Sequence, residues 1–362
     1  MAAVGKRSRT VLRILGAGFG AVLLLAAVAW VASREVRYVT RAAFEEALIL
    51  ARRRPIAKVV ADPATDAATR GKLELVLAAR DFAAESLHLA ARRTYTTYSR
   101  VDRDTLVLVL SASPSDRLVP YLWRYPVVGR VPYKGFFDLA GAEAEAARLR
   151  RMGMDTYVRV SDAFSTLGWF EDPLLSTIVG DDSVDLAATV IHEILHNTIW
   201  VPGNVAFNES LADFVGYRGA ERFFMARGDR RSAAFAAARW QDEIRLSHFY
   251  DSLAASLDRL YATRPAGAAL EAGRERIFAA ARAALADSVG RTLRTIDGRR
   301  MAQRQLNNAV VVAARLYRTD LDRFEAVLAS DGGDIVRAIA DLKRRTAAGD
   351  PWEPAPLPRD RP

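Results

Sequence analysis

The stretch HEILH at residues 192–196, followed by NESLAD at residues 208–213, carries the strongest structural signal in the chain. In a helix, side chains four positions apart lie on one face, with their Cβ atoms about 5 to 6 Å apart. His192 and His196 can therefore present ring nitrogens to one ion, and zinc takes such ligands at about 2.0 to 2.1 Å. Glu193 lies about 100° round the helix from His192. It can therefore face a water molecule on the ion, as a general base must.

A third ligand is predicted at Glu209. Residues 200–204 read WVPGN, which ends a helix because proline lacks an amide donor and glycine tolerates positive φ. Asn208 or Ser210 can then cap a second helix. A short link makes two helices antiparallel neighbours, so Glu209 is brought back over the histidines. Asp213 lies one turn further on the same face, where it can accept the free ring N–H of a ligating histidine.

The two motifs together are more specific than either motif alone. A bare HExxH occurs by chance on ordinary amphipathic helices, but here the second helix offers carboxylates at the right offset. The chain has only 4 histidines, and two of them lie in this motif. No third histidine follows in an HxxGxxH pattern, which excludes a metzincin. The arrangement is typical of the gluzincins, whose third ligand is a glutamate on the next helix, and it predicts one zinc ion held by His192, His196 and Glu209.

Composition excludes several other chemistries. The 362 residues include no cysteine, which excludes disulfides, thiolate metal sites, a cysteine nucleophile and a lipid-modified N-terminal cysteine. A net charge of +9 and a pI near 10.0 would suit a nucleic-acid-binding protein. The arginines alternate with acidic residues, however, as in 271–282 and 315–323. We therefore expect a solvated basic surface and no nucleic-acid partner.

The N-terminus carries a long apolar run. The run from Ile14 to Ser33 has no charged residue and follows four basic ones, Lys6, Arg7, Arg9 and Arg13. As a helix it would span about 30 Å, the thickness of a bilayer core. Residues 1–33 are therefore predicted to form a transmembrane anchor, with the N-terminus in the cytoplasm and the rest exported. A cleaved signal peptide ending near 27–29 is the alternative, and a buried soluble helix is disfavoured because no polar face interrupts the run.

The rest of the chain predicts an α+β fold that is predominantly α-helical. Three regions follow the anchor: a metal-binding core at 34–229, a helical subdomain at 230–348 and a disordered tail at 349–362. The subdomain is nearly all helical in pattern, with breaks at 265–267, 297–298 and 331–333. The tail is rich in proline and poor in apolar residues, which is typical of disorder.

The core combines helices with short strands. Apolar residues at helical spacing predict helices at 41–54, 72–92 and 139–152. Runs of β-branched and aromatic residues predict strands at 105–110, 125–131 and 156–160, with a turn at 111–116. We therefore expect a small mixed sheet with helices packed on it.

The segment FSTLGWF at 164–170 is another strand candidate, shortly before the metal-binding helix. In gluzincins an edge strand in this place pairs with the substrate backbone through free N–H and C=O groups. A buried hairpin with Trp169 in the core explains the pattern equally well. Glu171 and Asp172 follow directly and could hold a substrate's free ammonium group, which removal of an amino-terminal residue requires. The GxMEN motif of the best-known gluzincin exopeptidases is absent, so endopeptidase action stays open.

Four segments, in order along the chain, resemble the bacterial putative aminopeptidase family of predicted gluzincin-type zinc peptidases. They are 123–137 (WRYPVVGRVPYKGFF), 163–175 (AFSTLGWFEDPLL), 192–215 and 306–309 (LNNA). The resemblance implies a gluzincin-like fold, peptide substrates, zinc ligation by His192, His196 and Glu209, and catalysis by Glu193. Together with the predicted anchor, it implies a single-pass protein of the bacterial inner membrane whose catalytic domain faces the periplasm.

The sequence departs from this family in two respects. Members are often lipoproteins, whereas this chain offers only an apolar N-terminal helix. Residues 194–195 and Asn197 replace the more usual residues inside and after HExxH, and both changes leave the ligands intact.

The remaining parts of a zinc-peptidase site are not decided by sequence. Such a site needs a further hydrogen-bond donor for the oxyanion, often Tyr or His, and Tyr133, Tyr317 and His248 are the candidates. The competing function is a non-catalytic, membrane-anchored binding or scaffold protein that keeps zinc for folding. Glu193 favours the peptidase, because a structural zinc site needs no base and closes its fourth position.

Overall fold

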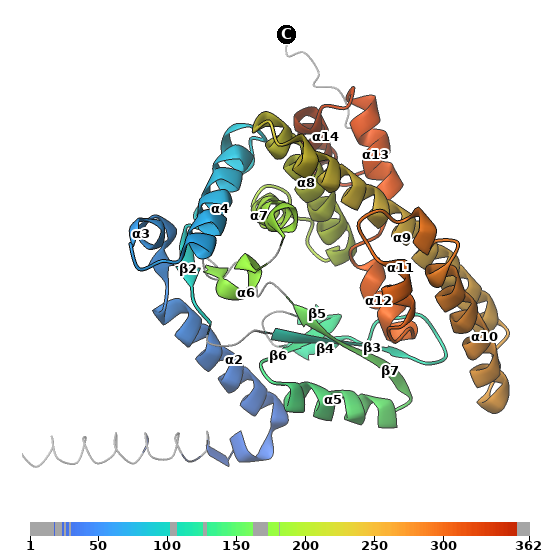
Figure 1. The fold of residues 1–362 in the computed structure, drawn as a ribbon. Coiled ribbons are helices and arrows are strands. Elements are labelled where there is room, and N and C mark those ends of the chain that lie inside the picture. Colours follow the sequence, from blue (N-terminus) through green and yellow to red (C-terminus); the bar gives the residue numbers. More distant parts are fainter. Residues whose placement is uncertain are drawn as a thin grey trace, which may run out of the picture. The chain divides into compact units, whose positions relative to one another are not determined.

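The computed structural model describes residues 30–101, 107–125, 129–161, 173–180 and 182–352, and four single positions before residue 30. The chain divides into two compact units, Met1–Arg52 and Arg53–Pro362 (Figure 1). In the first unit, Ser33 caps helix α2 (Arg34–Ala51) by accepting a hydrogen bond from the amide of Val36. Among the described residues, no helix combines the length and apolar character that crossing a bilayer demands. The predicted anchor at 1–33 lies almost wholly outside these residues.

Two helices open the second unit. They are α3 (Ile56–Ala61) and α4 (Ala67–Glu85). Asp66 caps α4 by accepting from the amide of Thr69 at 2.9 Å. The predicted helix at 72–92 ends early, because His88 and Arg92 adopt positive φ angles of 55° and 44° that no α-helix contains.

The described strands form two three-stranded sheets and one two-stranded sheet. The first contains β3 (Val107–Pro114), β6 (Tyr133–Phe136) and β7 (Met154–Ser161) in the order β6-β3-β7. All its pairings are antiparallel, so the prediction of a mixed arrangement from these strands is wrong. The predicted turn at 111–116 is also wrong over residues 111–114, because β3 pairs with β7 as far as Pro114. Ser111 and Ser113 are buried strand residues, and the prediction of a turn rested on serine being common in turns.

The other strands are short. The predicted strand at 125–131 is divided into β4 (Trp123–Tyr125) and β5 (Gly129–Val131), which pair with each other. A second three-stranded sheet joins β1 (Arg54–Pro55), β2 (Thr97–Ser99) and β8 (Leu174–Leu175), and it is mixed because β2 and β8 run parallel.

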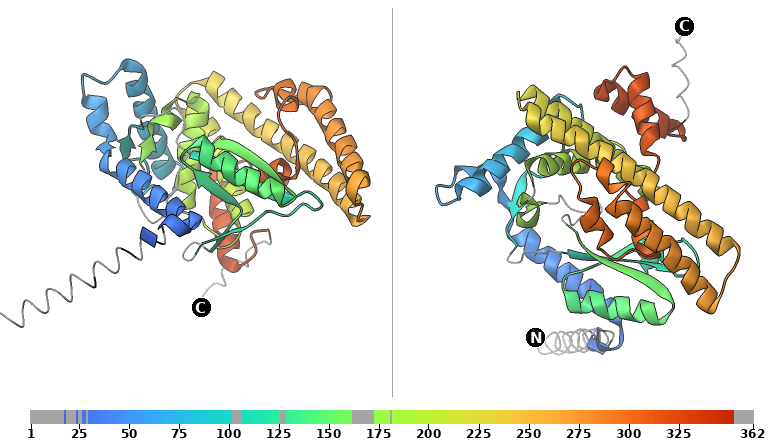
Figure 2. Two further views of the ribbon diagram at one scale, coloured as in Figure 1. Left: turned by 90° about the horizontal axis from the view of Figure 1, so that it is seen from below. Right: turned by 45° about the vertical axis from the view of Figure 1, so that its right-hand side comes forward.

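The β6-β3-β7 sheet carries helices on both faces (Figures 1 and 2). Helix α5 (Leu139–Arg151), close to the predicted 139–152, packs on one face around Leu110 and Leu149. Helix α12 (Asn308–Arg315) packs against β3 and β7. Side chains alternate between the faces of a strand, and Ser111 lies opposite Tyr133 and Tyr157. The face away from α5 therefore carries these two tyrosines and Arg159, two residues beyond Tyr157.

Long helices make up the rest of the second unit. The metal-binding motifs lie on α7 (Ser183–His196) and α8 (Val205–Ala226), preceded by the short α6 (Ser176–Val179). The C-terminal helices are α9 (Arg230–Ala262), α10 (Gly267–Ala286), α11 (Gly298–Ala302), α13 (Leu321–Ser330) and α14 (Ile335–Ala348), with a 3-10 turn at Gly290–Thr292. All three predicted breaks are confirmed as the ends of helices.

Aromatic contacts hold the C-terminal end in place. Trp352 belongs to the segment predicted as a disordered tail, yet its ring centre lies 5.6 Å from that of Phe207 and 4.9 Å from that of Phe324. The guanidinium of Arg323 lies 4.3 Å from the same ring centre. Ordered packing therefore continues past residue 349, and residues 353–362 lie outside the described part.

Candidate metal centre

Helix α7 presents the HExxH motif from a helix that is otherwise buried. It packs against α4, α8 and α9, and Figure 1 shows it between α4 and α8. Leu186, Val190 and Ile194 on its apolar side are fully buried, whereas His192 and His196 are partly exposed, at 13% and 19% of their side chains. Burial of one stripe thus fixes which residues the helix turns towards the site.

Close packing of α7 and α8 depends on a glycine. A Cβ added to Gly216 would lie 2.9 Å from the carbonyl oxygen of Ala188 and 3.4 Å from the Cβ of His192. Contacts of this kind to backbone cannot be relieved by a rotamer change. Gly216 therefore sets the distance between the helix that carries the histidines and the helix that carries Glu209.

The turn between these helices is fixed by an asparagine. Asn208 accepts a hydrogen bond from the amide of Val201 and donates one to its carbonyl oxygen, both at 2.9 Å. The residue that caps α8 is Asn204, whose side chain accepts from the amide of Phe207 at 3.2 Å. The predicted caps at Asn208 and Ser210 are therefore wrong. The helix starts earlier because Gly203, at φ +79°, turns the chain directly into Asn204.

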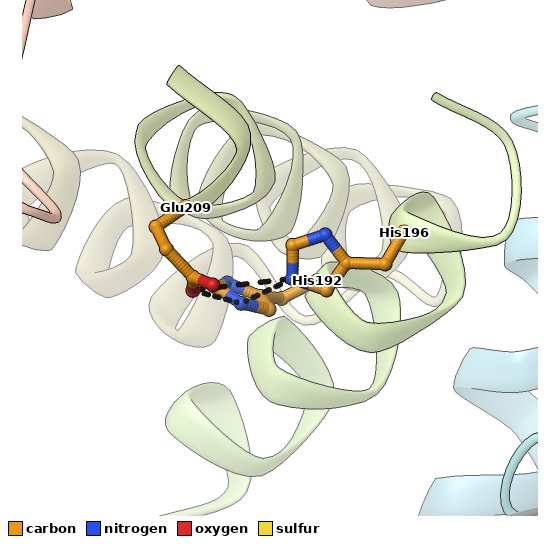
Figure 3. Close-up of side chains that lie close together, drawn as sticks. All are labelled: His192, His196 and Glu209. Carbon is orange, nitrogen blue, oxygen red and sulfur yellow. Dashed lines mark hydrogen bonds and ion pairs between the residues drawn. The ribbon is translucent and has the colours of Figure 1, made fainter. Parts of the chain in front are cut away.

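His192, His196 and Glu209 converge, and each offers one ligand atom within 4.8 Å of the others (Figure 3). The two histidine Nε2 atoms are 3.2 Å apart. An oxygen of Glu209 lies 3.4 Å from Nε2 of His192 and 3.9 Å from Nε2 of His196. Ligand atoms at about 2.1 Å from one tetrahedral ion lie about 3.4 Å from one another. The three side chains can therefore hold a divalent metal ion with little movement.

Asp213 supports the first of these ligands. Its carboxylate lies 2.8 Å from Nδ1 of His192, so Nδ1 carries the proton and Nε2 is left to face the metal position. A buried ion pair lies behind Asp213: Arg318 and Glu243 are 2.6 Å apart, and the charges of both act on Asp213. The orientation of His192 is thus set by its hydrogen bond to Asp213.

The ionisation states of His196 and Glu209 favour cation binding. Burial, together with the charge of His192, lowers the pKa of His196 to about 4, so His196 is neutral near pH 7. Burial also disfavours the charged form of His192, but the carboxylates of Asp213 and Glu209 outweigh this and raise its pKa. Burial would raise the pKa of Glu209, yet the hydrogen bond from His192 and the positive charges nearby hold it below its usual range. Glu209 is therefore an anion ready to bind a cation.

Glu193 lies beside the ligands on the same helix. Its side chain is partly buried, and its negative charge contributes to raising the pKa values of both His192 and Tyr133. Its charge therefore acts both on a proposed metal ligand and on a tyrosine of the sheet.

Two of the three predicted oxyanion donors lie near Glu209. Burial and then the charge of Glu209 raise the pKa of Tyr133 to about 12. The same two causes raise the pKa of Tyr317 far above its usual range. Both hydroxyls are therefore protonated at neutral pH and able to donate. His248 lies elsewhere: its side chain is 58% exposed and its Nε2 is 2.5 Å from Asp322. Glu171, Asp172 and the strand candidate at 164–170 fall outside the described residues.

The LNNA segment explains how Tyr317 reaches the centre. Asn307 caps α12 and donates to the carbonyl oxygen of Thr156 at 3.1 Å. Asn308 donates to the carbonyl oxygen of Pro114 at 2.8 Å, and its amide donates to Asp155 at 2.9 Å. These bonds fasten α12 to the sheet, and Tyr317 follows directly after that helix.

Two residues near the centre have no motif that would have revealed them. Trp200, 49% exposed, sets its ring edge-on to His196 with the ring centres 5.5 Å apart. The guanidinium of Arg159 lies 5.8 Å from the ring centre of Tyr317, and its charge acts on Glu209, Tyr133 and Tyr317. The sequence places Arg159 only within a strand, so its proximity to the centre arises from the tertiary fold.

Comparison with known proteins agrees with a peptidase class for this site. Residues 37–352 match the family described as putative aminopeptidase. The match spans most of the chain, and the chain belongs to this family. The comparisons with curated proteins and with solved structures gave no match.

Proposed function

We propose that the protein is a zinc metallopeptidase of the gluzincin type, with His192, His196 and Glu209 as ligands and Glu193 as general base. The observation that carries this proposal is the convergence of the three ligand atoms within 4.8 Å. Membership of the putative aminopeptidase family supports peptides as substrates. A scaffold that keeps zinc only for folding would need neither Glu193 nor a ligand set limited to three side chains.

Each residue has a role in the proposed reaction. When bound, zinc supplies Lewis-acid chemistry and makes water acidic enough to lose a proton near pH 7. Glu193 takes that proton and passes it to the departing amine. Asp213 keeps His192 in the tautomer that leaves Nε2 free. Tyr133 and Tyr317, which hold their protons, are the proposed donors of hydrogen bonds to the oxyanion.

We further propose that the enzyme is an aminopeptidase, as its family description suggests. Glu171 and Asp172 are the proposed partners of the substrate's ammonium group. Incubation with a mixed peptide library, read by mass spectrometry beside a zinc measurement, tests this. We expect one zinc ion per chain and products that lack one amino-terminal residue. Internal cleavage would contradict the exopeptidase assignment, and zinc without any product would support the scaffold.

The proposed location is the bacterial inner membrane, with the catalytic unit in the periplasm. The uncharged run from Ile14 to Ser33 and the four basic residues before it support this. Membrane fractionation of the full chain beside a chain that starts at residue 34 tests it. We expect only the full chain in the membrane fraction, and equal recovery of both there would contradict the anchor.

A further inference from the structure

Arg159 lies on the side of the sheet that faces the metal centre. It belongs to β7, an outer strand of the β6-β3-β7 sheet, and lies opposite Val109 of β3. Tyr133 lies two positions from Gly135, the other residue opposite Val109. Because alternate residues share a face, Arg159 and Tyr133 project from the same face. The charge of Glu209 interacts with both side chains.

Arg159 differs from three other arginines of the second unit that have little exposed surface. Arg318, Arg274 and Arg218 have side-chain exposures of 20%, 9% and 17%, and each lies 2.6 Å from a carboxylate oxygen. Arg159 is also partly buried. In the described part of the chain it forms no ion pair, and its guanidinium contacts the ring of Tyr317. A partly desolvated guanidinium without a carboxylate has unused hydrogen-bonding capacity.

The carboxylates beside Arg159 are already engaged. Glu209 contacts both histidines, and Asp213 contacts His192. With Glu193, they bring three negative charges, of which a divalent ion offsets two. Arg159 offsets the third, so a substrate that carries a negative group meets a centre without net charge.

We propose that Arg159 binds a carboxylate of the peptide substrate close to the scissile bond, an inference that rests on the proposed peptidase function. The planar guanidinium fork matches a carboxylate with two parallel hydrogen bonds. The C-terminal carboxylate of a short peptide supplies this group in every substrate, whatever its side chains. The enzyme is therefore specific for dipeptides and other short peptides with a free carboxyl end. An acidic side chain offers the same chemistry and is distinguished by the experiment below.

The test compares three probes: leucyl-glycine, leucyl-glycine amide and leucyl-aspartate α-amide. We expect the wild-type protein to hydrolyse the free acid with a kcat/KM about 10- to 100-fold above that for the glycine amide, as one charged hydrogen-bond pair provides. Arg159→Gln should abolish this difference through KM for the acid and leave the amide within about 3-fold. Arg159→Lys should restore part of it. If the aspartate amide matches the free acid, a side-chain carboxylate binds as well as the terminal one, and the specificity for free carboxyl ends is overturned.

The matched control is Arg151→Gln on α5, which is exposed and lies on the helix covering the opposite face of the sheet. It should leave the preference between acid and amide unchanged. An equal loss on acid and amide in Arg159→Gln, or no preference in the wild-type protein, would overturn the proposal. The preference of the wild-type protein for acid over amide is measured without any variant, so it tests the proposal even if Arg159→Gln does not fold.

A binding measurement separates this proposal from the proposed function. Calorimetry on Glu193→Gln, with and without Arg159→Gln, reports affinity without turnover. Tighter binding of the free acid that depends on Arg159 supports the carboxylate site even if no peptide is hydrolysed, in which case only the peptidase assignment fails. Equal binding of acid and amide, or binding of neither, overturns the carboxylate site. Zinc content and unfolding temperature of each variant show whether it is folded.

Discussion

Glu193→Gln is expected to lower kcat for peptide hydrolysis by about 100- to 10,000-fold, the contribution of a positioned general base. The amide has the shape of the carboxylate but cannot take a proton from water. The proposed metal ligands are His192, His196 and Glu209, whose ligand atoms lie within 4.8 Å of one another, so zinc per chain should stay at the wild-type level. Loss of turnover with metal retained is the result that a chemical role for Glu193 requires, and steady-state kinetics beside metal analysis measures it.

The control is Glu271→Gln, an exposed position on α10. It removes the same charge from the same kind of helix and should leave kcat unchanged. Wild-type turnover in Glu193→Gln would contradict the proposed mechanism. Equal absence of turnover in the wild-type protein and in Glu193→Gln, with zinc bound to both, would point to the scaffold.

His196→Ala is expected to lose zinc. Its Nε2 lies 3.2 Å from that of His192 and 3.9 Å from Glu209, so removing it opens the ligand triangle. Removal of a hydrogen-bond partner behind a ligand costs about 10- to 100-fold in metal affinity, and removal of the ligand itself should cost more. Competition with a chromogenic chelator measures the affinity. Peptide hydrolysis should fall with zinc occupancy.

His248→Ala provides a matched comparison. This exposed histidine pairs with Asp322, and its replacement should leave zinc affinity unchanged. Wild-type zinc affinity in His196→Ala would mean that other groups hold the metal. Loss of zinc from both variants would indicate that histidine replacement destabilises the fold in general.

The convergence of His192, His196 and Glu209 was predictable because its information is local. A period of 3.6 residues places His192 and His196 on one side of α7, and the Pro-Gly pair at 202–203 returns the chain at once to Glu209. The same reasoning located the C-terminal helices, whose breaks coincide with positive φ at Gly267, Gly332 and Gly333. Glycine adopts positive φ more readily than other residues, so it is a strong signal for the end of a helix.

Features that depend on distant partners were not predictable. Ser111 and Ser113 were predicted to lie in a turn because serine is common in turns. Only their pairing with β7 shows that they belong to a strand. The role proposed for Arg159 depends on Tyr317, which is distant in sequence but whose ring centre lies 5.8 Å from the guanidinium. Asn208 was predicted as a possible helix cap, because asparagine is a common capping residue. Its actual hydrogen bonds, to Val201, depend on the geometry of the turn, which the sequence does not show. In each case the residue type allowed several roles, and tertiary packing selected one.

The bonds between Asn208 and Val201 have a consequence for metal exchange. A cross-link that closes a loop of about 15 residues contributes about 3 kcal/mol by restricting the unfolded chain, and an ion spanning 197–208 closes a loop of that size. Here two hydrogen bonds already join Asn208 to Val201, so we expect the apoprotein to keep this turn after the proposed ion departs. We then expect metal binding to be reversible, with the cellular supply of divalent cations determining which of them is acquired.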